Sequence, residues 1–302
     1  MEISEKRWAA ESVKTVACEY CRAPEADFVT YKSQDRTFSL TSDRIVGMYR
    51  CGQCALYFAY PKPSLSELKK FFAGEYYAAK YGTKLAAALA AYPSGRSIAA
   101  EIKDLRRRAK DLLHMVSGKR YLRIEDLLRR HVIHLSDARP VVLEIGGGVS
   151  PYLYLEREGF SYSCIEPSMD AVDSFRDKGY DSVAQGFAED LGAVRTGSVD
   201  AIMYIKTLAH VSDLKRALAE ARRVLRDGGI MIIADSNGDG DILENIVSSY
   251  SYYMFPKQFL SRFMEGFTLA EQIFVDDQWK ICPDGLKMVA VLKKERCLHA
   301  KD

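Results

Sequence analysis

The sequence of 302 residues has no apolar run that approaches the length of a membrane-spanning helix. Its N-terminus, MEISEKRWAA, has no apolar core of the kind that a secretory signal needs. Neither sign of charge dominates, because 43 Lys and Arg face 41 Asp and Glu. We therefore expect a cytoplasmic protein without a membrane partner. A net charge of +2 disfavours nucleic acid only mildly, and the sequence does not define an oligomeric state.

Seven cysteines without a secretory signal favour metal binding over a disulfide framework. Four of them form two Cys-x-x-Cys pairs, Cys18 with Cys21 and Cys51 with Cys54. Two such pairs supply the tetrahedron that Zn²⁺ prefers, and four thiolates leave no open position, so the predicted zinc is structural. A redox role would need only one pair. With the β-prone segments DFVTYKS and RIVGMYR between the pairs, the sequence predicts a zinc-ribbon domain over residues 1–72.

Residues 73–138 are predicted to form a helical connector or lid. Just before them, Ser64 and Glu67 fit a capping box that starts a short helix, which Gly74 can end. From Thr83 to about His134, apolar residues recur at helical spacing. We expect the basic cluster of this region to be a solvated helix face; it comprises Arg106, Arg107, Arg108 and Lys110.

An aromatic cluster lies between the two regions and comprises Phe71, Phe72, Tyr76, Tyr77 and Tyr81. Most of these rings are expected to form a buried seam between modules. A tyrosine in an entry segment can also reach into a cleft, so Tyr76 and Tyr77 are candidates for contact with a substrate or for lid closure.

From Pro140 the pattern alternates between strand and helix. The strand candidates are VVLEI, YSCIEP, DAIMYI and GIMIIAD, and the helix candidates are PYLYLEREG, MDAVDSFRDKG and SDLKRALAEARRVLRDG. Such alternation predicts an α/β domain, here residues 139–302, with a parallel sheet that binds ligands at its carboxyl edge. The last two β-prone segments, FTLAEQIFVDD and GLKMVAVLKK, are expected to form a closing hairpin.

A glycine turn follows the first of these strands in VVLEIGGGVS. Gly146, Gly147 and Gly148 let the backbone approach a ligand closely, and the next helix is expected to begin near Ser150 with its free N–H groups facing that ligand. Glu166 ends the second strand, where a carboxylate can accept both hydroxyls of a ribose. These features fit NAD and S-adenosylmethionine equally well.

Three observations separate the two cofactors. The dinucleotide fingerprint needs a third glycine where this sequence has Pro151. Glu144 precedes the glycines, where an acid would repel a pyrophosphate but can meet the amino group of S-adenosylmethionine. The third observation is the closing hairpin formed by the last two β-prone segments. The sequence therefore favours S-adenosylmethionine over a nicotinamide cofactor.

With these motifs in order, the chain from Pro140 to about Lys294 resembles the class I S-adenosylmethionine-dependent methyltransferases. The segments that carry the resemblance are VLEIGGG, IEPS, GFAEDL, SVDAIMYIKTLAHV and LRDGGIMIIAD. It implies a Rossmann-like sheet of seven strands whose last strand runs antiparallel. The first eighty or so residues resemble the zinc-ribbon methyltransferases of bacterial natural-product and deoxysugar pathways. The sugar C-methyltransferases of that group carry a further C-terminal domain that this sequence does not include, so the substrate stays open.

The resemblance also implies roles for individual residues. Glu144, Gly146 and Gly148 would line the methionine side of the donor, Glu166 would bind the ribose, Pro167 and Ser168 would lie beside the adenine, Phe187 and Ala188 would flank its ring, and Ile205 and Lys206 would close the site. The acids Glu189 and Asp190 also suit a helix N-terminus, the interpretation preferred for Asp190.

Methyl transfer is an in-line displacement, which needs a base only if the acceptor loses a proton. His210 follows the fourth strand and is the candidate base, with Tyr77 as the second candidate catalytic residue; an exposed histidine before a helix capped by Ser212 is the alternative. The favoured acceptor is a small polar molecule, either a sugar nucleotide or a natural-product intermediate. The alternatives are an RNA or protein methyltransferase that uses the ribbon as a reader, and a non-catalytic scaffold.

Overall fold

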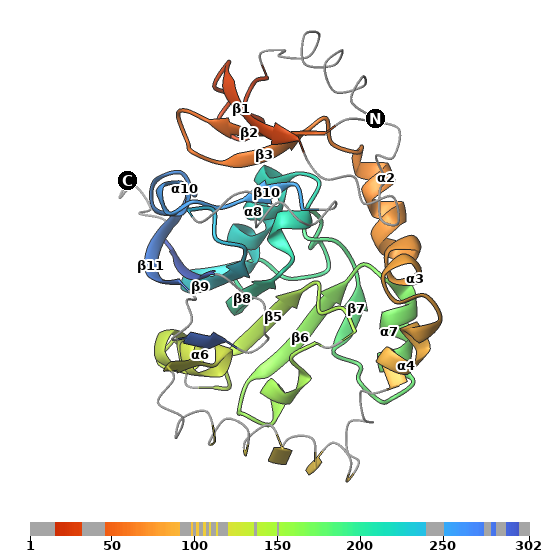
Figure 1. Ribbon diagram of the computed structural model, residues 1–302. Coiled ribbons are helices and arrows are strands. Elements are labelled where there is room, and N and C mark those ends of the chain that lie inside the picture. The colour runs from red at the N-terminus through yellow and green to blue at the C-terminus, as the bar shows by residue number, and fades with distance from the viewer. Residues whose placement is uncertain are drawn as a thin grey trace.

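The computed structural model describes residues 16–31, 46–90, 120–135, 138–149, 151–239, 251–274, 279–281 and 288–295, with single residues or pairs between 98 and 113. A seven-stranded sheet forms the centre of the molecule, and a four-stranded sheet lies at one end of it (Figure 1). Across these described ranges, no helix is both long and apolar enough to cross a membrane.

The central sheet has the order β11-β13-β9-β8-β5-β6-β7. Its strands are β5 (Val141–Ile145), β6 (Ser161–Glu166), β7 (Val183–Gln185), β8 (Val199–Ile205), β9 (Leu225–Asp235), β11 (Phe267–Phe274) and β13 (Met288–Lys294). The strands from β9 to β7 are parallel, and β13 is antiparallel to both of its neighbours. The predicted Rossmann-like sheet of seven strands, with an antiparallel last strand in a closing hairpin, is confirmed.

Alternation along the strands gives the sheet two buried faces. On β8, Ile202 and Tyr204 join one hydrophobic cluster, while Met203 and Ile205 join the other. The helices divide in the same way: α8 (Leu214–Val224) and α10 (Lys257–Arg262) pack into the first cluster, and α6 (Ile124–Val132) and α7 (Met169–Arg176) pack into the second. Both faces are covered, as a largely parallel sheet requires.

The four-stranded sheet carries the cysteine pairs and is built from distant parts of the chain. Its strands are β1 (Ala26–Tyr31), β2 (Gly47–Cys51), β3 (Tyr57–Tyr60) and β10 (Tyr253–Met254), in that order. The last of these comes from the C-terminal part of the chain and pairs antiparallel with β3. The ribbon residues and the first face of the central sheet also share one hydrophobic cluster. The proposed boundary at residue 72 remains a prediction.

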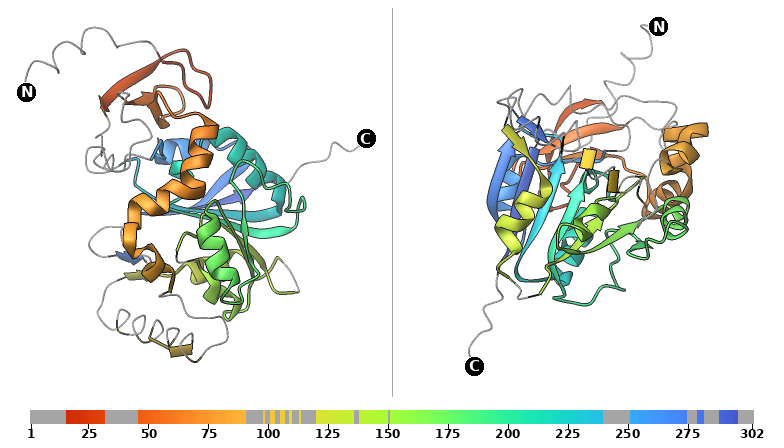
Figure 2. Two further views of the ribbon diagram at one scale, coloured as in Figure 1. Left: turned by 90° about the vertical axis from the view of Figure 1, so that its right-hand side faces the viewer. Right: turned by 90° about the horizontal axis from the view of Figure 1, so that it is seen from below.

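A rod of short helices leads from the small sheet to the far end of the molecule (Figure 2, left). It consists of α2 (Leu65–Lys70), the π-helix η1 (Phe71–Glu75), α3 (Tyr76–Tyr81), the 3₁₀-helix η2 (Gly82–Lys84) and α4 (Leu85–Ala90). The capping box of Ser64 and Glu67 is confirmed. The prediction that Gly74 ends the helix is wrong, because the backbone continues through it as one wide turn in which the Phe71 and Tyr76 rings pack together.

Two further helix predictions need correction. Within the stretch expected to be helical, the short strand β4 (Arg120–Leu122) pairs in parallel with β12 (Trp279–Ile281), so a distant partner overrides the local pattern. The helix expected near Ser150 is only a 3₁₀ turn, η3 (Leu153–Glu156). Of the basic cluster, Arg106 is exposed, whereas Arg107, Arg108 and Lys110 lie outside the described residues.

Candidate functional site

The glycine turn after β5 is crowded by the protein itself. Gly146 and Gly148 have φ of +76° and +64°, a region that favours glycine. A Cβ on Gly146 would lie 2.6 Å from the side chain of Thr207, and one on Gly147 would lie 2.6 Å from Cys164 Sγ and 2.7 Å from Pro151 Cβ. The sequence predicts glycine at these positions because a ligand approaches closely, and the structure adds a second reason, the lack of space for a side chain. These glycines also let β5, β6 and β8 meet at their carboxyl ends.

Gly147→Ala is expected to destabilise the fold by roughly 1–3 kcal/mol, because the new methyl group overpacks two rigid neighbours. Gly74→Ala is the matched control, since among the described residues nothing lies within 4 Å of its Cβ position. Urea unfolding followed by circular dichroism measures both variants. A Gly147→Ala midpoint equal to that of the wild type would contradict this packing.

Glu166 stands at the end of β6, next to the turn, and is only 2% exposed. Its Oε2 accepts from the Gly148 N–H at 2.9 Å, and its Oε1 accepts from the Ser168 N–H at 3.0 Å. The Tyr77 hydroxyl of α3 donates to Oε1 at 3.2 Å. Burial raises the pKa of Glu166, and these three donors oppose that rise. The glycine turn, β6 and the helical rod thus meet at one carboxylate.

Glu144 lies on β5 and is buried beneath the turn. Its Oε2 accepts from the Tyr152 N–H at 2.8 Å and from the Tyr162 hydroxyl. Burial, the largest cause, raises the pKa of Glu144 to about 7. The bond to Tyr152 also explains the short η3 turn, because it holds the preceding backbone against β5. Contact of Glu144 with a bound donor stays a prediction.

Because of the raised pKa of Glu144, the free energy of unfolding is expected to decrease as the pH rises. Because the pKa is raised on folding, the stabilisation is complete below the unfolded value near 4.5 and is lost as pH rises to about 7. The loss amounts to at most about 3 kcal/mol. Glu144→Gln is expected to remove this pH-dependent loss. Urea unfolding of both proteins from pH 4.5 to 8 measures it, and parallel curves would contradict the assignment.

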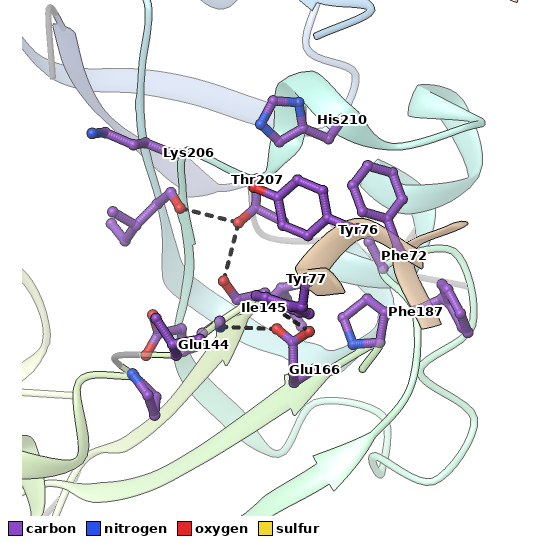
Figure 3. A pocket seen from close by; sticks show the side chains of 18 of the residues that line it. Phe72, Tyr76, Tyr77, Glu144, Ile145, Glu166, Phe187, Lys206, Thr207 and His210 are labelled. Atoms are coloured by element: carbon purple, nitrogen blue, oxygen red, sulfur yellow. Dashed lines mark hydrogen bonds between the residues drawn. The ribbon is translucent and has the colours of Figure 1, made fainter. Parts of the chain in front are cut away.

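A cavity of about 610 Å³ opens between the carboxyl edge of the central sheet and the helical rod (Figure 3). Of the residues predicted for the donor and for catalysis, those that line it are Tyr77, Glu144, Gly146, Gly147, Gly148, Glu166, Pro167, Phe187, Ala188, Ile205, Lys206 and His210. Ser168 is the exception, because it is fully buried as the N-cap of α7. The structure therefore brings the predicted residues into one cavity, while their roles remain predictions.

The end of β8 forms the wall of the cavity opposite Glu166. Lys206 has φ of +54°, which is strained for a residue other than glycine and is common at functional sites. Thr207 Oγ1 donates to the Ile205 carbonyl oxygen at 3.0 Å. His210 follows in η4 (Leu208–His210), and its Nδ1 lies 3.4 Å from Ser251 Oγ. This places His210 in the cavity, as predicted.

The rod supplies the remaining side of the cavity. Its aromatic residues were predicted from the sequence to lie in a seam, with Tyr76 and Tyr77 as candidates for contact with a substrate. The ring centroids of Phe72 and His210 are 6.3 Å apart, and Tyr76 packs against both Phe72 and Tyr77 (Figure 3). Four of the five rings of the aromatic cluster therefore line the cavity, namely Phe72, Tyr76, Tyr77 and Tyr81, and a seam between modules stays a prediction. Lys69 also lines the cavity, with its Nζ 5.2 Å from the centre of the Phe187 ring.

Two expectations about the neighbouring loop are wrong. Asp213, not Ser212, caps α8, because its side chain accepts from the Arg216 N–H. Glu189 and Asp190 do not start a helix of their own; Glu189 Oε1 instead accepts from the Ser212 N–H at 2.7 Å and from the Ser212 hydroxyl at 2.6 Å. The acid thus holds the entry to a later helix.

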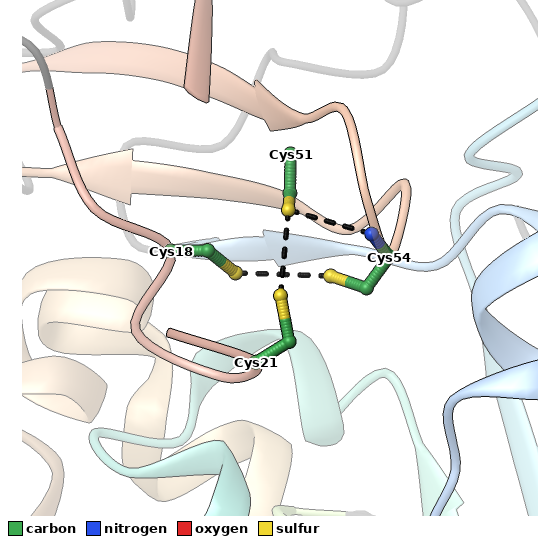
Figure 4. Close-up of side chains that lie close together, drawn as sticks. All are labelled: Cys18, Cys21, Cys51 and Cys54. Atoms are coloured by element: carbon green, nitrogen blue, oxygen red, sulfur yellow. Dashed lines mark hydrogen bonds between the residues drawn. The ribbon is translucent and has the colours of Figure 1, made fainter. Parts of the chain in front are cut away.

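The four paired cysteines converge in the small sheet (Figure 4). Their sulfurs lie within 4.8 Å of one another, with 3.7 Å between Cys18 and Cys54 and 3.5 Å between Cys21 and Cys51. Zn–S bonds of about 2.3 Å in a tetrahedron put sulfurs roughly 3.8 Å apart, so the residues fit Zn²⁺. The bond with Cys54 lowers the pKa of Cys18 to about 5, which favours a thiolate there.

Solved structures match part of this chain at low sequence identity and with TM-scores below 0.5. A methyltransferase from Methanosarcina mazei described as SAM-dependent is 15% identical, with a TM-score of 0.42 over 58% of this chain and 99% of its own. One from Thermotoga maritima is 22% identical, with a TM-score of 0.40 over 56% and 92%. The [4+2]-cyclase SpnF is 17% identical, with a TM-score of 0.43 over 56% and 79%. No curated protein matches the chain.

A family model described as a methyltransferase domain matches residues 143–233, from β5 through β9. These residues contain the glycine turn, Glu166, the GFAEDL segment and His210. The strand order around them, with an antiparallel strand between two parallel ones at one edge, is the order that the resemblance implied. Residues 143–233 thus match a methyltransferase domain, and the sheet that contains them has the strand order implied by the resemblance to the class I S-adenosylmethionine-dependent methyltransferases.

Proposed function

We propose that this protein transfers the methyl group of S-adenosylmethionine to a small polar molecule. The observation that carries the proposal is a single cavity that unites the glycine turn, the buried carboxylate of Glu166 and His210. Its volume of about 610 Å³ suits a donor together with part of a small acceptor. A structural Zn²⁺ on the four cysteines is part of the same proposal.

The residues of this chain would divide the work of a displacement reaction. Glu166 accepts hydroxyls of the ribose and so fixes the donor along the turn. Phe72 and Tyr76 cover the cavity from the rod and exclude water, which leaves alignment as the main contribution to rate. His210 takes the proton from an acceptor that must lose one. S-adenosylmethionine itself supplies the activated methyl group.

Two alternatives make different predictions. An RNA or protein methyltransferase would present its acceptor site as an open basic groove, whereas the rod covers this cavity with aromatic rings. A non-catalytic scaffold would bind no donor. Calorimetry with S-adenosylmethionine, S-adenosylhomocysteine and NAD tests the proposal directly. Binding of the first two is expected, and binding of NAD alone would overturn it.

His210→Ala is expected to leave the affinity for S-adenosylhomocysteine within about twofold, because the proposed donor contacts lie at the glycine turn and at Glu166. For an acceptor that loses a proton, its turnover should fall by roughly 100-fold or more. His131→Ala is the matched control, since His131 binds Glu271 outside the cavity. Single-turnover methyl transfer with radiolabelled donor measures both. Full turnover by His210→Ala would remove it as the base.

A further inference from the structure

We propose that Lys62 is a positioning residue that ties the first cysteine pair to the wall of the cavity at Ser212. Metal binding in the small sheet would then act on the affinity for the donor as well as on folding. This inference rests on the proposed function. It also makes predictions about backbone order that do not depend on donor binding.

Lys62 joins three elements that are far apart in the sequence. Its side chain is only 11% exposed. The Nζ donates to Glu19 Oε1 at 2.6 Å, to the Ser212 carbonyl oxygen at 2.9 Å, and to the Tyr253 hydroxyl of β10. An ammonium group has three protons and no acceptor capacity. These three partners therefore match its hydrogen-bonding capacity, and Lys62 has no donor left for a ligand.

The first of these partners belongs to the cysteine cluster. Glu19 lies between Cys18 and Cys21, in the turn whose backbone closes through the Arg22 N–H to the Cys18 carbonyl oxygen at 2.9 Å. The position of the Glu19 carboxylate is therefore set by the turn that offers two sulfurs to a metal. Loss of the metal would release that turn and remove a fixed anchor from Lys62.

The second partner belongs to the cavity. Ser212 and Glu189 both line it, and both donors of Ser212 bind Glu189 Oε1. The Asp213 N–H donates to the same oxygen at 3.3 Å. Lys62 holds the carbonyl oxygen of Ser212 while Glu189 holds its amide and hydroxyl. The segment that follows His210 is thus held from both sides, and one side depends on the cysteine turn.

Burial makes the Lys62 contacts strongly interdependent. Desolvation lowers the pKa of Lys62, and the neighbouring carboxylates oppose that shift, with Glu19 foremost. Removing one partner of a buried ion pair costs more free energy than the intact pair contributes, because the other charge stays buried without compensation. A substitution of Glu19 is therefore expected to displace the Lys62 ammonium group and so to weaken its hydrogen bond to the Ser212 carbonyl oxygen. The centroid of the Tyr253 ring lies 4.4 Å from Lys62 Nζ, and this cation–π contact helps to hold the ammonium group between Glu19 and Ser212.

The test compares Lys62→Met with Lys70→Met, which changes an exposed lysine at the end of helix α2, in metal-loaded and metal-depleted protein. Coupling between two sites typically changes an affinity by about 5- to 150-fold. Metal removal is expected to weaken binding of S-adenosylhomocysteine to the wild type about tenfold. Metal-loaded Lys62→Met should keep one zinc and show a similar loss, and metal removal should change its affinity little further.

Equal weakening of the wild type and of Lys62→Met on metal removal would overturn the proposal, as would wild-type affinity in metal-loaded Lys62→Met. If metal-depleted protein or Lys62→Met unfolds, the metal-loaded Glu19→Gln variant tests the coupling instead. Faster hydrogen exchange at the Ser212 and Asp213 amides of this variant supports the coupling, and unchanged exchange refutes it. If the wild type binds no donor, the proposed function fails, and the exchange measurement on the wild type with and without metal still decides the coupling.

Discussion

Glu166→Gln is expected to weaken binding of S-adenosylhomocysteine by about 100-fold or more. A hydrogen bond to a charged group is worth about 1.5–3 kcal/mol, and a carboxylate at this position can accept two from the ribose. Loss of roughly 3 kcal/mol corresponds to about two decades of affinity. The substituted amide also turns one oxygen into a donor, which must face the N–H of Gly148 or of Ser168. The turn and the ribose site are thus impaired together.

Calorimetry measures the Glu166→Gln affinity, with circular dichroism to show that the variant is folded. Asp170→Asn is the control, because Asp170 is an exposed acid in the first turn of the neighbouring helix α7. Tyr77→Phe separates two contributions, since it removes the rod's bond to Glu166 and keeps the carboxylate. A folded Glu166→Gln variant with wild-type affinity would refute the ribose role and, with it, the main support for the donor site.

The central sheet could be predicted because its signals are local. The strands β5, β6, β8 and β9 are short apolar runs, and the helices α7 and α8 carry their own periodicity, so these elements are readable without knowledge of their neighbours. The carboxyl edge then follows from topology, which is why the glycine turn, Glu166 and His210 could be assigned to one site. Their convergence in one cavity follows from strand order rather than from any single motif.

What the sequence did not reveal depends on contacts between distant residues. The pairing of β10 with β3, and of β12 with β4, joins short segments with little pattern of their own. Lys62 looks like an ordinary lysine between two prolines, and only the fold shows that Glu19 and Ser212 meet at its ammonium group. Burial that emerges from tertiary packing has no signature in one stretch of sequence.

The cap of α8 was misassigned for a related reason. Ser212 and Asp213 are both good N-cap residues, and local chemistry does not rank one above the other. Glu189, placed by a different loop, takes the Ser212 hydroxyl and leaves Asp213 to cap the helix. The π-turn of η1 is similar, because ring packing among Phe71, Phe72 and Tyr76 outweighs the tendency of Gly74 to end a helix.

Cys18→Ser is expected to abolish stoichiometric zinc binding and to lower the melting temperature of the whole described core by about 10 °C. Structural zinc sites contribute folding free energy directly, because the site does not exist in the unfolded chain. Removing one of four ligands should cost several kcal/mol, and each kcal/mol shifts the midpoint of a domain of this size by about 2–4 °C. The effect is not confined to the ribbon, since Cys18 shares a hydrophobic cluster with Ile145 and Tyr204 of the central sheet.

Elemental analysis of freshly purified Cys18→Ser protein measures its zinc content, and thermal unfolding followed by near-ultraviolet circular dichroism measures its melting temperature. Cys164→Ser is the matched control, because Cys164 is equally buried but belongs to the opposite face of the sheet. It should keep one zinc per chain, whatever its own stability. If Cys18→Ser lost the metal and melted like the wild type, the cysteine cluster would be irrelevant to the core. A shared loss of metal and of cooperative unfolding would instead show that the small sheet and the central sheet fold as one unit, because β10 and the common hydrophobic cluster leave neither complete without the other.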